Sequence, residues 1–157
     1  MSNEPLTLNE VLAGAIQKEI EAHRLYEGMS ESVTEPAVKD AFRDLAKQED
    51  GHRKLLEEYW RGEIKEGALH SGQRIDYRIA EALDQPAVTP DISLKDAFLL
   101  AANREKVSHD FYLALAGIHP EGRIKGLFLE LADQEMGHKH RVEYLYTEVA
   151  FPQTDGG

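Results

Sequence analysis

The chain has 157 residues, no cysteine and a formal net charge of −11 at pH 7. The lack of cysteine excludes disulfides, thiolate nucleophiles, zinc ribbons and cysteine-ligated iron–sulfur centres. The negative charge argues against a nucleic-acid partner, which needs clustered Lys and Arg. Excess carboxylates suit cation binding, although they also serve simply to keep an acidic surface soluble.

The length predicts a single domain over residues 1–157. No apolar run approaches the roughly 18 residues that a membrane span requires, and no basic-then-apolar leader opens the chain. We therefore expect a cytoplasmic protein without a membrane partner.

Apolar residues recur at intervals of three and four, which predicts an all-α fold. The segment 7–10 (TLNE) has the spelling of a capping box and predicts a first helix from about Leu8 to about Ser30. Pro36 suits the first turn of a second helix, which we expect to end near Gly62.

Residues 62–92 contain several glycines and prolines, and we interpret them as a crossover connection with a short helix near 75–83. A cap signature at 93–96 (SLKD) predicts a third helix that ends near Gly117. After a turn at 119–122, a fourth helix should reach about Val149, followed by a loop-like tail at 150–157. Two hairpins joined by a long connection predict a four-helix bundle with one crossover.

The two hairpins are internally repeated. LAKQEDGH (45–52) and LADQEMGH (131–138) share six letters at an offset of 86 residues. The same offset matches Glu19 with Glu105, His23 with His109, and Tyr26 with Tyr112. If the hairpins pack against each other, equivalent residues should face one another about a pseudo-twofold axis.

The repeated residues have the types and spacing of metal ligands. Each copy contributes Glu-x-x-His, whose side chains share one helix face, and a further helical glutamate. Four buried carboxylates would repel one another, whereas two divalent ions would neutralise them. This set is the one that di-iron and di-manganese bundles use, so iron or manganese fits, zinc is a further option, and imidazole disfavours calcium. The predicted ligands are Glu19, Glu49, His52, Glu105, Glu135 and His138.

Further repeated residues surround these ligands. Tyr26 and Tyr112 lie two turns beyond the helical glutamates and are the candidate catalytic residues. They are either core tyrosines or hydroxyls that bond a ligand carboxylate. His23 and His109 follow the same glutamates by four residues, and we expect them to support the ligands or the core, with a role as spare ligands as the alternative.

The remaining histidines and two helical glycines are not predicted to bind the metal. His70, His119 and His140 have no repeated equivalent, and we expect them on the surface. Gly51 and Gly137 precede the ligand histidines, and glycine costs about 1 kcal/mol relative to alanine inside a helix. A close helix crossing is the favoured explanation, and room for a small oxidant or a local helix distortion is the alternative.

The sequence resembles the rubrerythrin branch of the ferritin-like di-iron carboxylate family. The resemblance covers roughly residues 8–149 and is carried by E-x-x-A-x-x-L-Y from Glu19, by LAKQEDGH, by Glu105 through Tyr112, and by LADQEMGH. It implies a ferritin-like fold, a pair of iron ions (Fe²⁺/Fe³⁺) held by the six ligands, and reduction of hydrogen peroxide or oxygen by the diferrous form.

Two departures from the family pattern change these expectations. Rubrerythrins usually carry a cysteine-ligated rubredoxin module, so here the electrons should come from an external donor such as a rubredoxin-like protein. Family members also carry a glutamate three residues after the position of Glu105, where this chain has Ser108, and His138 occupies a position where glutamate is common. A more symmetric centre, closer to ferroxidase centres, is implied.

The leading functional hypothesis is therefore a peroxide-reducing di-iron oxidoreductase that protects against oxidative stress. The alternatives are a ferroxidase that handles iron, a di-iron oxygenase with an apolar substrate pocket, and a helical interaction module. Cage ferritins usually append a fifth short helix, whereas only FPQTDGG follows here, so we expect a homodimer or a small homo-oligomer.

Overall fold

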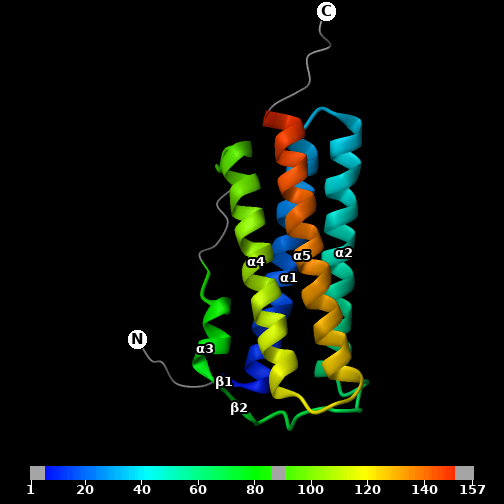
Figure 1. The fold of residues 1–157 in the computed structure, drawn as a ribbon, viewed down its shortest axis with the longest axis vertical. Coiled ribbons are helices and arrows are strands. Elements are labelled where there is room, and N and C mark those ends of the chain that lie inside the picture. The colour runs from blue at the N-terminus through cyan, green and yellow to red at the C-terminus, as the bar shows by residue number, and fades with distance from the viewer. Residues whose placement is uncertain (1–5, 86–90, 151–157) are drawn as a thin grey trace, which may run out of the picture.

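Four long antiparallel helices form a bundle in the computed structural model, which describes residues 6–85 and 91–150 (Figure 1). Helices α1 and α2 make one hairpin, α4 and α5 make the second, and the hairpins pack through α1 with α4 and α2 with α5. The predicted all-α four-helix bundle of two hairpins is confirmed. The long helices are α1 (Leu8–Ser32), α2 (Pro36–Trp60), α4 (Leu94–Ile118) and α5 (Arg123–Ala150).

The helix starts follow from local sequence, as expected. The Thr7 hydroxyl accepts a hydrogen bond from the Glu10 backbone N–H, and the Glu10 carboxylate accepts one from the Thr7 N–H, which completes the capping box. Ser93 caps α4 by accepting from the Asp96 N–H at 3.2 Å. Pro36 is the first residue of α2, where a missing N–H leaves no hydrogen bond broken.

The connection between the hairpins carries several short elements. Strand β1 (Leu6–Thr7) pairs antiparallel with β2 (Arg74–Ile75), and α3 (Tyr77–Ala80) continues into the 3₁₀ helix η1 (Glu81–Leu83). The strands were not predicted, because two residues are too few to show an alternating pattern. The expected short helix is present as α3 and η1.

Figure 1 shows that the described parts of the crossover lie near opposite ends of the bundle. Strand β2 and α3 lie at the end where α1 begins, and α4 begins at the opposite end. Ala150 ends α5 instead of starting the tail, and the remaining tail, 151–157, lies outside the described residues.

The buried interior has three layers along the bundle. One apolar cluster joins the start of α1 to the ends of α2 and α4, and it includes Leu12, Leu56 and Leu115. A second cluster at the other end includes Phe42 and Phe98. Between them lies a layer of buried carboxylates and imidazoles. Within the described part of the chain, no helix combines the length and apolar character needed to cross a membrane.

Candidate metal centre

The six predicted ligands converge in this central layer. Helices α1 and α4 each supply one glutamate, Glu19 and Glu105, and α2 and α5 each supply a Glu-x-x-His pair. Every one of the six side chains is buried, with no more than 4% of any residue exposed. Helical spacing of three residues puts the members of each pair on one face, and bundle packing aims both faces inward.

The cluster divides into two overlapping groups of potential metal ligands, each with its ligand atoms within 4.8 Å of one another. Glu19 and His52 belong to the first group, and Glu105 and His138 belong to the second. Glu49 and Glu135 belong to both groups. Because a carboxylate has two oxygens, each of these two glutamates could contribute to both ions of a pair.

Each histidine presents Nδ1 to the cluster. His52 Nδ1 lies 3.0 Å from Glu135 Oε1, and His138 Nδ1 lies 2.6 Å from Glu49 Oε1. The other ring nitrogen, Nε2, donates to a glutamine of the opposite hairpin, Gln134 for His52 and Gln48 for His138, at 2.7 Å in both cases. A proton on Nε2 leaves the Nδ1 lone pair available for a metal.

Acidic residues one turn earlier fix the orientation of these glutamines. The Gln48 amide N–H donates to Asp44 at 2.7 Å, and that of Gln134 donates to Glu130 at 3.2 Å, so each amide oxygen faces its histidine. Sequence reasoning assigned the glutamines no role, although their recurrence in LAKQEDGH and LADQEMGH was the available signal.

The donor set fits a pair of divalent cations. Across residues 6–85 and 91–150, six buried side-chain atoms lie close to one another but make no hydrogen bond of acceptable geometry, and one belongs to each predicted ligand. Buried polar atoms without partners are costly unless something else satisfies them. Oxygen and nitrogen ligands suit iron or manganese, and two divalent ions balance four carboxylates. The unpartnered atoms are Glu19 Oε2, Glu49 Oε1, His52 Nδ1, Glu105 Oε2, Glu135 Oε1 and His138 Nδ1.

The metal-free cluster is electrostatically strained. Burial and the charges of the other glutamates raise the pKa of Glu49 well above its usual range, and burial followed by the Glu135 charge raises the pKa of Glu105 to about 8. Burial opposes a charged imidazole, but contacts with Glu135 and Glu19 outweigh it and raise the pKa of His52 to about 11. Contacts with Glu105 and Glu135 likewise raise the pKa of His138 to about 9. Without metal the cluster therefore holds protons in place of cations.

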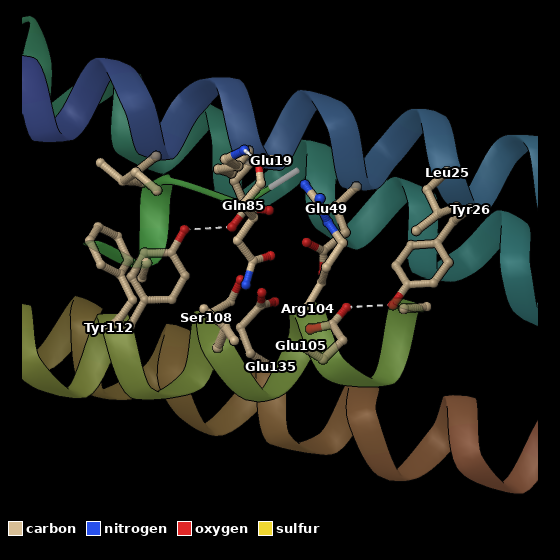
Figure 2. A pocket seen from close by; sticks show the side chains of 18 residues that line it. Glu19, Leu25, Tyr26, Glu49, Gln85, Arg104, Glu105, Ser108, Tyr112 and Glu135 are labelled. Atoms are coloured by element: carbon tan, nitrogen blue, oxygen red, sulfur yellow. Dashed lines mark hydrogen bonds between the residues drawn. The ribbon is translucent and has the colours of Figure 1, made fainter. Parts of the chain in front are cut away.

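The two candidate tyrosines link the hairpins through the ligands (Figure 2). Tyr26 donates to Glu105 Oε1 at 2.6 Å, and Tyr112 donates to Glu19 Oε1 at 2.5 Å. Burial and nearby carboxylate charges raise the pKa of both hydroxyls well above the usual value, so each remains a donor. Each tyrosine is thus both a core residue and a hydroxyl bonded to a predicted ligand of the other hairpin.

Four of the other histidines lie outside both ligand groups, in two kinds of environment. His23 and His109 donate from Nδ1 to the backbone oxygens of Ala46 and Ala132, at 2.7 and 2.6 Å, so they brace neighbouring helices and belong to neither ligand group. His70 and His140 are exposed, as expected.

The prediction for His119 was wrong, because this residue is buried at the end of α4. Its Nδ1 donates to the Leu115 oxygen at 2.6 Å, and its Nε2 accepts from the Tyr59 hydroxyl at 2.7 Å. Burial lowers its pKa, which keeps the ring neutral. A residue at a helix end can turn inward when tertiary partners satisfy both nitrogens, and sequence spacing does not reveal such partners.

The favoured explanation of Gly51 and Gly137 was also wrong. A Cβ added at either position would meet no atom within 4 Å, so no helix crosses closely there. A position one residue before an inward-facing histidine is rotated by about 100° around the helix, away from the bundle axis. The structure provides no packing reason for either glycine.

Comparisons with known proteins agree with the geometry. Residues 10–74 match the Rubrerythrin family model, and they include most of α1 and all of α2, with Glu19, Glu49 and His52. No curated protein matches the chain. The resemblance to the rubrerythrin branch, recognised from the repeated motifs, is confirmed over these residues.

Two solved structures share the fold. A hypothetical protein from Pyrococcus furiosus has a TM-score of 0.74 and 24% identity, covering 95% of this chain and 94% of its own. A protein from Thermotoga maritima, described as a ferritin-like diiron-carboxylate protein, has a TM-score of 0.74 and 21% identity, covering 94% of this chain and 99% of its own. The ferritin-like fold is thereby established for nearly the whole chain.

Proposed function

We propose that this chain is a non-haem di-iron oxidoreductase that reduces hydrogen peroxide, or oxygen, with electrons from an external donor. The match of its first hairpin to the Rubrerythrin model and its ferritin-like fold support this proposal. The observation that carries this proposal is the set of six buried ligand atoms without partners. They form two groups that share Glu49 and Glu135, which suits two ions held close together.

A pair of Fe(II) ions would supply the two electrons that convert hydrogen peroxide and two protons into two water molecules. The residues of this chain would hold the ions and orient their ligands. Glu19 and His52 would hold one ion, Glu105 and His138 the other, and Glu49 and Glu135 would contribute to both. Tyr26 orients the Glu105 carboxylate, Tyr112 orients that of Glu19, and each hydroxyl holds a proton beside the centre.

Iron handling is the second candidate, and the symmetry of the centre favours it. Both halves present equivalent ligands, equivalent tyrosines and equivalent glutamines, and Ser108 lines the pocket where the rubrerythrin pattern has another carboxylate. In this reaction iron is the substrate, oxidised and passed on. Di-iron oxygenation receives less support, because the cavity beside the centre measures only about 30 Å³.

The deciding experiment is anaerobic loading with Fe(II), followed by stopped-flow mixing with hydrogen peroxide or oxygen. We expect about two irons per chain, and faster oxidation by peroxide than by oxygen at equal concentration. Glu49→Ala with Glu135→Ala should abolish loading, whereas Glu31→Ala with Glu148→Ala, two exposed residues, should not. Equal rates with both oxidants would contradict peroxide reduction, and uptake far beyond two irons per chain would indicate iron handling.

We also propose that a separate protein supplies electrons and that the chain forms a small homo-oligomer. The 157 residues contain no cysteine, so a rubredoxin-like protein or a comparable donor would return the diferric centre to the diferrous state. A homodimer or small homo-oligomer is the proposed assembly. Light scattering of the iron-loaded protein tests the assembly, and reduction by a rubredoxin under anaerobic conditions tests the donor.

A further inference from the structure

A small cavity reaches the centre from the face between α1 and α4 (Figure 2). Its volume is about 30 Å³, and its inner wall includes four of the predicted ligands, Glu19, Glu49, Glu105 and Glu135. One water needs on the order of 15 Å³ measured in this way, so the space is about that of two water molecules. The small side chains of Ala22, Ala101 and Ser108 also line this space.

Two cations related by the internal repeat stand at this cavity. Lys18 and Arg104 are separated by the same 86 residues as the ligands, and each directly precedes a ligand glutamate. They share one carboxylate: Glu21 Oε2 accepts from Arg104 at 2.8 Å and from Lys18 at 3.3 Å. The residue equivalent to Glu21 is Val107, so this carboxylate has no counterpart in the second hairpin.

Two half-buried residues of the crossover, Leu83 and Gln85, line the cavity and form its outer cover. Lys18 also donates to the backbone oxygen of Gln85 at 3.3 Å, and Leu83 lines the cavity beside it. Leu83 is seated on α1 at Gly14, where an added Cβ would lie 2.8 Å from Leu83 Cδ1. The cover is therefore an apolar side chain fixed against a glycine and a backbone group fixed by a lysine.

We propose that this cavity is the oxidant-binding pocket of the centre and that Lys18, Arg104 and Leu83 determine which oxidants enter. The inference rests on the proposed di-iron function and names its substrate class. Two cations beside the cavity favour a small polar oxidant or small anion, and they oppose entry of a further metal cation by this route. The volume of about 30 Å³ suits hydrogen peroxide better than organic hydroperoxides, which are several times larger.

Charge and size can be tested separately. Azide, a small linear anion, is titrated into the diferric protein and its binding followed by absorption. We expect Lys18→Gln to weaken azide binding about tenfold, because one of the two cations that line the cavity is lost. Lys106→Gln is the matched control, because Lys106 lies on α4 with an exposed side chain paired to Asp110 and does not line the cavity.

For size, the rates of diferrous oxidation by hydrogen peroxide and cumene hydroperoxide are compared. Leu83→Ala should raise the cumene hydroperoxide rate relative to the hydrogen peroxide rate about tenfold, because truncation opens the cover of a tightly packed space. Leu99→Ala, at an exposed site on α4, should leave the ratio unchanged.

The outcomes separate this inference from the proposed function. Unchanged azide affinity in Lys18→Gln together with an unchanged rate ratio in Leu83→Ala would overturn the pocket assignment, even if the wild type reduces peroxide. A wild type that loads iron but does not react with peroxide would refute the proposed function, while the azide titration would still decide the charge role of Lys18. A chain that binds no metal would overturn both.

Discussion

At the scale of single residues, the two glutamines behind the histidines determine how the centre is presented to a metal. Each glutamine amide is fixed by an acidic residue of its own helix and directs its oxygen to Nε2 of a histidine in the other hairpin. The imidazoles can therefore use only Nδ1 toward the cluster. Hydrogen bonds of this kind raise the basicity of a ligand histidine and fix its ring.

We expect Gln48→Leu with Gln134→Leu to weaken metal affinity by roughly 10- to 100-fold, because both rings lose their orienting partners. Competition with a coloured chelator for Mn(II) measures this change. Gln17→Leu is the control, because Gln17 is an exposed residue of α1. Unaltered affinity in the double variant would mean that packing alone holds the rings.

The pKa values of the histidines predict how metal binding depends on pH. In the metal-free protein the pKa values of His52 and His138 are raised to about 11 and about 9, so both rings are protonated at neutral pH. A metal must displace these protons, so affinity should increase as the pH rises toward 9, and protons should be released on binding. A pH indicator in weak buffer measures the release. Affinity that is constant between pH 6 and pH 8 would contradict this prediction.

At the scale of helices, α2 and α5 each carry a glycine that packing does not require. Both positions have open space where a Cβ would be, so alanine fits without displacing a neighbour. We expect Gly51→Ala and Gly137→Ala each to increase the free energy of unfolding by about 1 kcal/mol, because alanine restricts the unfolded chain and favours the helix.

Urea denaturation of the metal-free protein measures this stabilisation. Gly14→Ala is the matched contrast: it lies within α1, but its Cβ would press on Leu83, so it should gain less. If Gly51→Ala or Gly137→Ala is destabilising, the glycines serve an interaction outside the single chain or a helix distortion near the ligands.

At the scale of the whole molecule, the bundle places a layer of like charges between two apolar clusters. The apolar ends favour association of the hairpins, whereas the carboxylates of the central layer oppose it. The reciprocal bonds from Tyr26 to Glu105 and from Tyr112 to Glu19 tie the hairpins together across this layer. Metal ions in the layer would remove the remaining repulsion.

We therefore expect metal to stabilise the folded chain strongly. Mn(II), or Fe(II) without oxygen, should raise the melting temperature, since a ligand at 100 times its Kd contributes about 2.7 kcal/mol to the native state. The increase should vanish in Glu49→Ala with Glu135→Ala and persist in Glu31→Ala with Glu148→Ala. An increase that survives in the first variant would place the metal elsewhere.

Local sequence features alone determined the positions of the long helices and the set of candidate ligands. Caps at Thr7 and Ser93 and a proline at position 36 define where helices begin, and apolar spacing defines their inner faces. The internal repeat identified six residues that the fold brings together, because helical spacing and symmetry constrain where such residues can point.

Only the tertiary structure decided features that depend on residues far apart in the chain. It paired Tyr26 with the glutamate of the other hairpin, buried His119 against Tyr59, and left Gly51 facing open space. It also placed Leu83 and Lys18 over the cavity. Spacing along one helix specifies a direction for each side chain but not the atoms that the packed bundle places there.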